Sequence, residues 1–158
     1  MPQNQTQLRQ ATIADLPEMK ELFRGTIMEV CAAEYDAAQR AVWASSSEKT
    51  ERWNALINEQ YVLLAVKNNV IVGFGSLLND NYLDFMYVHK GYQRQGVADM
   101  LLTAFETEAT RLKTTVITSD ISKTARPFFE KKGYVVVKEQ QNERGNVVLV
   151  NYKMEKEL

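Results

Sequence analysis

The sequence contains very few of the residues that build metal sites and disulfides, since its 158 residues include one cysteine, Cys31, and one histidine, His89. A single cysteine forms no intrachain disulfide, and one histidine with one cysteine does not complete a usual zinc site. A cysteine nucleophile is also disfavoured, because His89 is the single histidine that could activate Cys31. We therefore expect a protein without a metal cofactor, in which Cys31 is a partly buried thiol in a reducing compartment.

Neither sign of charge dominates the chain, and long apolar runs are missing. The formal net charge is −1, so the sequence lacks the clustered basic excess that is typical of nucleic-acid-binding proteins. No apolar segment approaches the ~20 residues of a membrane span. Residues 1–5 also lack the basic-then-apolar layout of a signal peptide. We expect a cytoplasmic protein whose partners include neither nucleic acid nor a membrane.

Length and composition fit a single globular domain over residues 1–158. Hydrophobic residues make up 45% of the chain and charged residues 25%, which are ordinary values for a globular protein. A chain of this length hides ~70% of its unfolded surface, so it needs no disulfide or metal to fold. A monomer and a homodimer both remain open, because an exposed terminal strand can pair with a second copy.

Hydrophobic periodicity and turn signals predict a mixed α+β sheet flanked by helices. The expected strands cover residues 8–13, 61–66, 70–78, 82–88, 114–118, 134–139 and 147–154. The expected helical stretches cover residues 16–27, 31–43, 48–58 with Ser47 as its cap, 97–112, and a last one from 122 or 124 to 133. The predicted order is β-α-α-β-β-β-α-β-α-β-β, which differs from the regular repeat of a doubly wound fold.

The clearest chemical signal lies where the strand at 82–88 leads through a polar loop into an amphipathic helix. The first amides of a helix have no internal acceptors and lie at the positive end of its dipole, which favours an anion. Gly96 and the small Ala98 let a ligand approach the backbone, and Arg94 adds a fixed positive charge. We interpret residues 94–98 as a cradle for a diphosphate; the alternative is a plain strand-to-helix turn.

Two segments resemble the motifs of one known family. Residues 88–98, VHxxYQxxGxA, resemble the acetyl-CoA-binding motif of the GNAT superfamily of N-acetyltransferases, whose core is Q/R-x-x-G-x-G/A. Residues 124–134, TARPFFEKKGY, resemble its second hallmark, an alanine followed by a helix that ends in a Tyr-Glu-Lys-x-Gly-Phe type of sequence. Residues 120–129 are also similar to bacterial acetyltransferases of the YafP type. The resemblance implies the GNAT fold over almost the whole chain.

The resemblance implies that acetyl-CoA is the cosubstrate. It implies that the strand at 82–88 splays from the strand at 114–118, with the pantetheine arm in the gap like an added strand. A backbone amide near Met86 or Val88 would then stabilise the oxyanion formed on attack. The residues expected to contact acetyl-CoA are Met86, Tyr87, Val88, Gln93, Arg94, Gln95, Gly96, Val97, Ala98, Ser122 and Phe129.

The implied reaction is direct attack of a primary amine on the thioester in a ternary complex, without a covalent enzyme intermediate. The amine must first lose a proton to a base or to a water chain. Asp84 is the candidate base, because strand alternation places it on the same face as Tyr82, Met86 and Val88. The alternative is that Asp84 is a hydrogen-bonded structural acid.

The usual proton donor to the leaving thiolate is missing. In the GNAT superfamily a tyrosine has this role, and Phe129 stands at the matching position here. Tyr87, Tyr134 or solvent would have to replace it. This departure leaves a second function open, a catalytically silent acyl-CoA-binding module, and the helix start alone also suits a nucleotide- or phosphate-binding protein.

The acceptor implied by the resemblance is a small-molecule or peptide amine. Glu34, Tyr35 and Tyr82 are expected to contact it, and the Glu34 carboxylate would attract a cationic amine. Trp43 and Trp53 lie in the same early region, where aromatic side chains at helical spacing are more often core residues.

Overall fold

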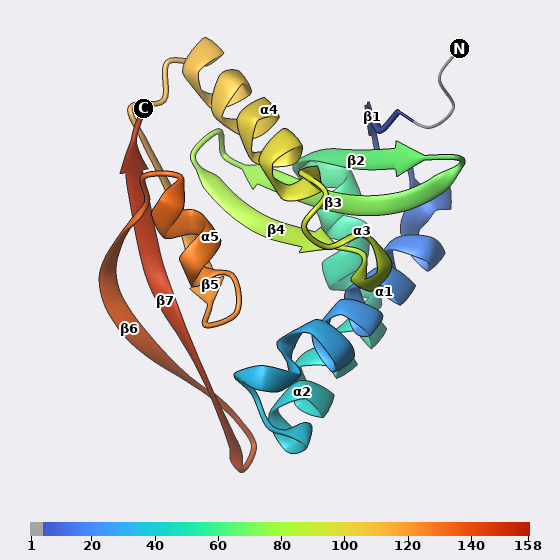
Figure 1. The fold of residues 1–158 in the computed structure, drawn as a ribbon, viewed down its shortest axis with the longest axis vertical. Helices are drawn as coiled ribbons and strands as arrows, with labels where there is room; N and C mark the ends of the chain where they lie inside the picture. The colour runs from blue at the N-terminus through green and yellow to red at the C-terminus, as the bar shows by residue number, and fades with distance from the viewer. Residues whose placement is uncertain (1–4) are drawn as a thin grey trace.

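Seven strands form one mixed sheet in the computed structural model, which describes residues 5–158 (Figure 1). The strand order across the sheet is β1-β2-β3-β4-β5-β7-β6. Neighbouring strands are antiparallel except β4 and β5, which run parallel because a helix connects them. The predicted mixed sheet with flanking helices is confirmed. Three α-helices lie between β1 and β2, in the three predicted helical stretches, although the predicted order counts two helices there.

The strands are β1 (Gln7–Gln10), β2 (Tyr61–Lys67), β3 (Val70–Leu78), β4 (Tyr82–Val88), β5 (Val116–Ser122), β6 (Val135–Arg144) and β7 (Val147–Glu157). The α-helices are α1 (Leu16–Gly25), α2 (Ala37–Ala44), α3 (Thr50–Glu59), α4 (Val97–Arg111) and α5 (Arg126–Lys131). Residues 1–4, on which the expectation about the start of the chain rests, lie outside the described residues. Among residues 5–158, no helix is both long and apolar enough to cross a membrane.

Two element boundaries differ from the predicted ones for reasons that lie elsewhere in the chain. β5 begins at Val116 and continues to Ser122, because it pairs with β7 along its whole length and Ser122 lies opposite Asn151. Ser47 is buried in a short 3-10 turn and does not cap the next helix, which begins at Thr50.

β4 contains one residue more than the part of β3 that it pairs with. Two neighbouring residues of β3 lie opposite Leu83 and Phe85, so Asp84 between them is the extra residue of a β-bulge. The bulge interrupts the alternation of side chains, because Leu83 packs with the core under α4 whereas Phe85 packs with the core under α1. The predicted alternation, which placed Asp84 on the face of Met86 and Val88, is therefore wrong.

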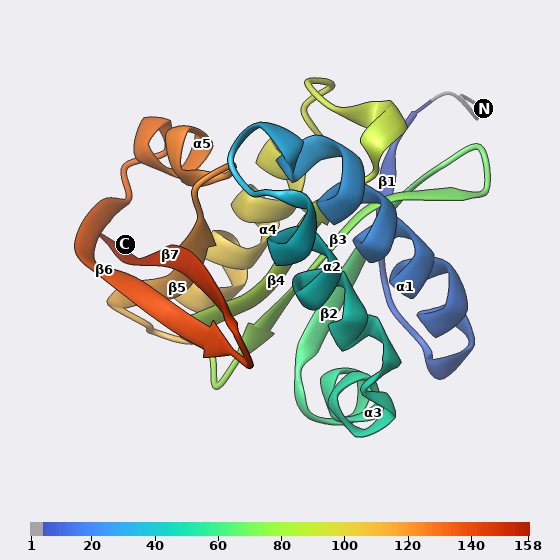
Figure 2. The same ribbon diagram turned by 90° about the horizontal axis from the view of Figure 1, so that it is seen from below.

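Helices cover both faces of the sheet (Figure 2). α4 packs on one face through Leu101 and Phe105. α1 and α3 pack on the other face, where Phe23 and Trp53 meet Phe74 of β3 in a second core. Aromatic and aliphatic side chains pack closely in both cores. The sheet is therefore a rigid support for the residues at its edges.

Two glycines of β3 let α4 lie directly on the sheet. A Cβ atom at Gly73 would come within 2.6 Å of a Val97 methyl group, and one at Gly75 would come within 2.8 Å of the Phe105 ring. Larger residues would push α4 away, because packed side chains do not tolerate such contacts. The glycines therefore fix the start of α4 beside the end of β4.

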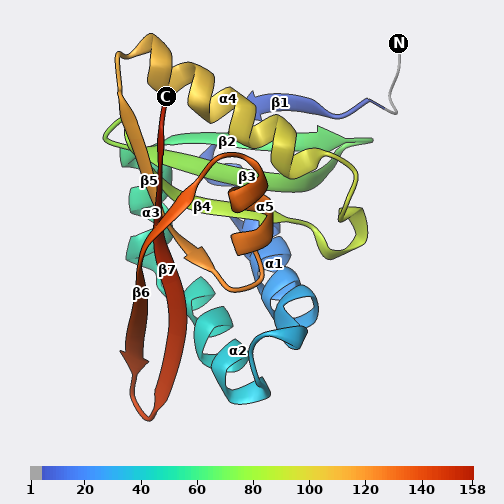
Figure 3. The same ribbon diagram turned by 60° about the vertical axis from the view of Figure 1, so that its left-hand side comes forward.

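β4 and β5 separate soon after they begin to pair. Their register covers Tyr82 opposite Thr118 and Leu83 opposite Ser119, just before the bulge at Asp84. Beyond that point β5, β7 and β6 run steeply across the direction of β2–β4 (Figures 1 and 3). The predicted splayed strand pair is confirmed, and the bulge supplies its cause, because a bulge bends its strand.

Candidate active site

The loop between β4 and α4 leaves a row of backbone amides without acceptors. Arg94 and Gly96 adopt left-handed backbone, with φ of 61° and 82°, a geometry that gathers successive amides into a concave anion site. Met100 donates its amide to the Gly96 carbonyl at 3.0 Å. Among residues 5–158, no carbonyl accepts from the amides of residues 95–99. These amides lie at the positive end of α4, where an anion is stabilised.

The space in front of these amides suits a diphosphate. A Cβ atom at Gly96 would meet no heavy atom within 4 Å, so the backbone there is open to a ligand. Arg94 and Gln95 are exposed at the rim, and Ala98 is half-buried. The donor set, the open front and the nearby cation fit the phosphates of acetyl-CoA.

Two residues of this loop serve the fold with their side chains. Gln93 Nε2 donates to the carbonyls of Val88 at 2.7 Å and His89 at 3.3 Å, which ties the loop to the end of β4. Val97 is 4% exposed and packs in the core under α4. Because their side chains are engaged in the fold, Gln93 and Val97 can contact an anion only through their backbone groups.

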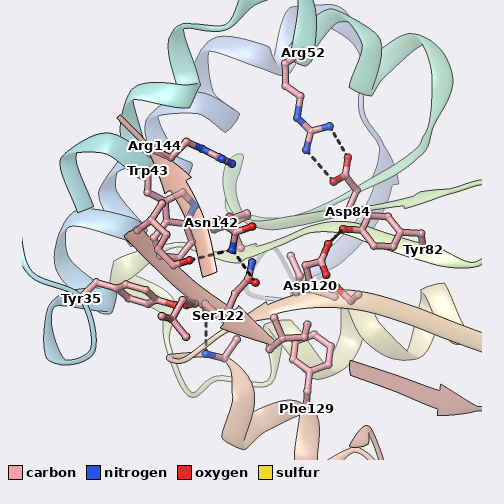
Figure 4. Close-up of a pocket in the computed structure, with 18 residues that line it drawn as sticks. Tyr35, Trp43, Arg52, Tyr82, Asp84, Asp120, Ser122, Phe129, Asn142 and Arg144 are labelled. Carbon is pink, nitrogen blue, oxygen red and sulfur yellow. Dashed lines mark hydrogen bonds and ion pairs between the residues drawn. The ribbon is translucent and has the colours of Figure 1, made fainter. Parts of the chain in front are cut away.

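A cavity of about 300 Å³ opens where β4 and β5 diverge (Figure 4). From the residues expected at the site it brings together Tyr35, Tyr82, Asp84, Met86, Tyr87, Ser122 and Phe129. It is further lined by Trp43, Arg52, Ser119, Asp120, Ile121, Ala125, Asn142, Arg144, Leu149, Val150 and Asn151. The expected residues that do not line it are Glu34, Val88, Tyr134 and residues 93–98.

The edge of β4 beside this cavity has backbone groups that do not pair with β3 and can bind a ligand. In an antiparallel pair, alternate residues turn both backbone groups toward the partner strand. On the β3 side, Phe85 donates its amide to the Ser76 hydroxyl at 3.2 Å, and His89 donates its amide to the Val72 carbonyl at 2.8 Å. Met86 and Val88 therefore turn theirs the other way, where β5 has already diverged. An extended ligand in this slot can pair with β4 as a strand would.

Asp84 is held in an ion pair. Arg52 of α3 donates from both terminal nitrogens to its carboxylate oxygens, at 2.7 and 2.8 Å, and Gln60 Nε2 donates at 2.7 Å. The Asp84 side chain is 10% exposed, and its hydrogen bonds raise the pKa of Arg52. The hydrogen bonds from Arg52 and Gln60 occupy both oxygens of this carboxylate. This geometry favours the structural alternative for Asp84.

Of the two tyrosines expected to replace the missing acid, Tyr87 lines the cavity and Tyr134 does not. Burial raises the pKa of Tyr87, and a hydrogen bond with the Trp43 side chain opposes this effect in part. The Tyr87 hydroxyl is therefore protonated at neutral pH. Tyr134 is 2% exposed and donates its hydroxyl to Glu106 of α4 at 2.8 Å. Tyr134 is therefore a core residue that links two elements.

Tyr35 and Glu34, both expected at the acceptor, have different surroundings. Tyr35 donates its hydroxyl to the Val150 carbonyl at 2.5 Å and accepts from the Lys123 amide at 2.9 Å. Its ring forms a wall of the cavity while its hydroxyl is engaged. Glu34 accepts from the Thr124 hydroxyl at 2.7 Å, outside the cavity.

Sequence reasoning missed a chain of hydrogen bonds beside one wall of the cavity, of which Figure 4 shows the pair Tyr82 and Asp120. Tyr82 donates its hydroxyl to Asp120 at 2.5 Å, and Gln140 of β6 donates to the other carboxylate oxygen at 2.8 Å. Gln140 and Asn142 each donate to Asn151 Oδ1 at 3.0 Å. The one signal for this wall was the period-two spacing of polar residues on the last hairpin.

Residues 31–156 match the family model described as an acetyltransferase (GNAT) domain. The chain belongs to the GNAT acetyltransferase family. In sequence, this GNAT protein is 30% identical over 151 residues to the uncharacterized N-acetyltransferase YafP of Escherichia coli strain K12, covering 96% of this chain and 95% of YafP. The predicted resemblance is confirmed.

Solved structures share the fold of this GNAT protein. The GCN5-related N-acetyltransferase of Rhodopseudomonas palustris has a TM-score of 0.93 at 30% identity, covering 100% of this chain and 99% of the other. The PaiA N-acetyltransferase of Thermoplasma acidophilum, in complex with coenzyme A, has a TM-score of 0.77 at 18% identity, covering 98% and 99%.

Proposed function

We propose that this GNAT protein transfers the acetyl group of acetyl-CoA to a primary amine by direct attack in a ternary complex. The observation that carries the proposal is the divergence of β4 from β5 after Leu83 and Ser119, which opens a cavity beside the backbone edge of Met86 and Val88. An extended arm that ends in a thioester fits this slot, because it can pair with β4 and present its acyl group to the cavity.

In this proposal the loop after β4 holds the pyrophosphate. The amides of residues 95–99 would donate to the phosphates, and Arg94 would add a positive charge. The complex of coenzyme A with the PaiA protein, which has the same fold, supports the class of cosubstrate. Acetyl-CoA supplies an activated acyl group, and the protein supplies its binding and orientation.

Backbone amides of β4 are proposed to stabilise the negative charge that develops on the thioester oxygen. Met86 and Val88 turn their amides toward the slot, and this end of β4 is held firmly. The Val88 carbonyl accepts from Thr26 Oγ1 at 2.8 Å and from Gln93 Nε2 at 2.7 Å. Loss of one such donor typically raises the barrier by about 3 kcal/mol.

The attacking amine must be neutral, and two carboxylates line the cavity. Asp84 is paired with Arg52, so we assign it the task of positioning β4 and Arg52. Asp120 accepts from the neutral groups of Tyr82 and Gln140, so we assign it the amine proton, taken directly or through water.

The thiolate that leaves must gain a proton. Tyr87 lines the cavity whereas Tyr134 does not, which favours Tyr87 over Tyr134 as the donor. When the amine nitrogen bonds to the acyl carbon, the carbon–sulfur bond breaks, and the proton from Tyr87 ends on sulfur. Solvent then restores the tyrosine.

Release of the CoA thiol from acetyl-CoA with a panel of primary amines tests the proposal. We expect release to depend on the amine and to fall in Tyr87→Phe, whereas Tyr134→Phe, outside the cavity, keeps it. Binding of acetyl-CoA without release for any amine would identify a silent acyl-CoA-binding module. Thermal stabilisation by ATP but not by CoA would identify a phosphate-binding protein instead.

A further inference from the structure

The far side of the active site carries more positive than negative charge. We propose that the acceptor is an amine that also carries an anionic group, as an amino acid does, and that Arg144 and Lys49 bind this group. The inference rests on the proposed function, because it names the substrate class of the same site.

A second cavity, of about 270 Å³, adjoins the first on the side of α2 and α3. The two cavities share lining residues that include Trp43, Arg52, Asp84, Tyr87 and Arg144. The slot between β4 and β5 is taken by the pantetheine arm in the proposed complex. The second cavity is then a route by which an acceptor can reach the thioester from the opposite side.

The charges of the second cavity do not balance. Its charged lining residues are three cations, Lys49, Arg52 and Arg144, and one anion, Asp84. Arg52 and Asp84 compensate each other in their ion pair. Within the described part of the chain, neither Lys49 nor Arg144 forms an ion pair. Lys49 and Arg144 are exposed residues at the rim of this cavity, where two uncompensated cations attract an anionic group.

Arg144 is placed by the register of the last hairpin. It is the final residue of β6, and the adjoining part of β7 is fixed to α2, because Gln39 Nε2 donates to the Val148 carbonyl at 2.9 Å. The Tyr35 hydroxyl fixes the same strand two residues further on. In Figure 4 the Arg144 side chain reaches from the hairpin along the cavity beside Trp43.

The negative charge of the site lies at the other end. Asp120 on β5 lines the first cavity and not the second. An acceptor can therefore place its amine beside Asp120 and its anionic group beside Arg144 and Lys49. Its charges then complement those at the two ends of the site. The half-buried ring of Trp43, 5.3 Å from Tyr35 between centroids, offers apolar surface between them.

This assignment differs from the expectation that Glu34 attracts a cationic acceptor. Glu34 lines neither cavity and accepts from the Thr124 hydroxyl. No glutamate contributes to the lining of these two cavities in the part of the chain that the structure describes. Among the described lining residues, an acceptor with a second positive group, such as a diamine, therefore finds no unpaired carboxylate for that group beside Asp120.

Phenylalanine and 2-phenylethylamine test the inference, because they share the ring and the amine and differ by one carboxylate. CoA release measures their turnover. Calorimetry measures the affinity of their acetylated products, N-acetylphenylalanine and N-acetyl-2-phenylethylamine, for the protein saturated with CoA. We expect the carboxylate-bearing member to be favoured by about tenfold in both measurements.

Variants of Arg144 test whether this residue causes the preference for the carboxylate. We expect Arg144→Ala to reduce the preference for the carboxylate and Arg144→Glu to reverse it. Arg111→Ala is the matched control and should retain the preference, because Arg111 is an exposed arginine of α4 that pairs with Glu108 and lines neither cavity. Circular dichroism verifies that each variant is folded.

Equal affinity for the two products, or a preference for the neutral one, would overturn the inference. The affinity ratio decides it even when neither amine turns over, because binding of the products requires no chemistry. Lack of turnover would then count against the proposed function alone. A preference that survives the double variant Arg144→Ala and Lys49→Ala would overturn the assignment of these residues.

Discussion

Arg52 of α3 donates from both terminal nitrogens to the Asp84 carboxylate, at 2.7 and 2.8 Å, and its guanidinium carbon lies 4.6 Å from the centre of the Phe85 ring. The pair fastens α3 to the residue that bulges from β4. Because the bulge bends β4 away from β5, the same pair supports the slot between the two strands.

Arg52→Ala and Asp84→Ala should be non-additive in the free energy of unfolding, with a coupling of about 1 kcal/mol. The coupling is modest because the Arg52 side chain is 45% exposed and solvent screens the pair. Urea unfolding of both single variants and the double variant measures it. We also expect Asp84→Ala to lower kcat/KM without removing the acidic limb of the pH profile. Additive losses of stability would contradict the coupling, and a lost acidic limb would assign Asp84 the role of base.

Gly96→Asp should weaken CoA binding by tenfold or more, which is about 1.4 kcal/mol or more, because it places a carboxylate in front of the amides proposed to bind the phosphates. Gly145→Asp is a matched control, since Gly145 also has a positive φ, 61°, and nothing within 4 Å of a Cβ atom. Calorimetric titration with CoA compares the two variants. Equal CoA affinity in both would count against the cradle at Gly96.

Phe129→Tyr should fold normally and retain or raise kcat. Phe129 is 1% exposed, lines the cavity and packs edge-on against Tyr134, with centroids 5.1 Å apart. A hydroxyl there adds a proton donor beside the slot. Phe128→Tyr is the control, because Phe128 is the neighbouring ring and does not line the cavity. A collapse of kcat in Phe129→Tyr alone would show that the Phe129 ring packs against the acyl or pantetheine group.

Asp15 should make the stability of the fold depend on acid pH. A hydrogen bond from Arg9 lowers the pKa of Asp15 from 3.8 to about 2. Ionised Asp15 therefore stabilises the folded state above pH 3.8, and this contribution is lost as the pH falls toward about 2.

The test compares the protein with Asp15→Asn. We expect a difference of about 0.5 kcal/mol in the free energy of unfolding at pH 7, since the pair is partly exposed, and a vanishing difference near pH 2. Arg9→Ala should show the same pH dependence because it removes the other partner. A difference that is constant from pH 7 to pH 2.5 in urea unfolding would contradict the assignment.

The features that neighbouring residues encode were predictable from the sequence. The turn at Asn68 and Asn69, with φ of 51° and 64°, and the helix stop at Gly133, with φ of 94°, depend on local conformational preference. The strand, loop and helix around Gly96 likewise form a continuous segment. Its motif could therefore be read before any strand pairing was known.

The features that depend on pairing between distant segments were not predictable. Nothing within residues 82–88 marks Asp84 as a bulge, because the extra residue is defined by its register with β3. Arg52 reaches the site from α3, and Arg144 reaches it from the last hairpin. No local motif predicts that either residue lies at the site. The predicted face of Asp84 was wrong for this reason, and the cations that line the second cavity were missed.

In the proposed function, the division of the sheet at β4 and β5 separates binding of the pyrophosphate from binding of the acceptor. The cradle after β4 belongs to one half, whereas Asn142, Arg144 and Leu149 of the other half line the acceptor side. Under the proposed function, substitutions on the hairpin would alter which amine is accepted while the cradle residues after β4 stay unchanged. In evolutionary terms, a lineage of such enzymes can diversify its substrates without having to reinvent its acyl donor.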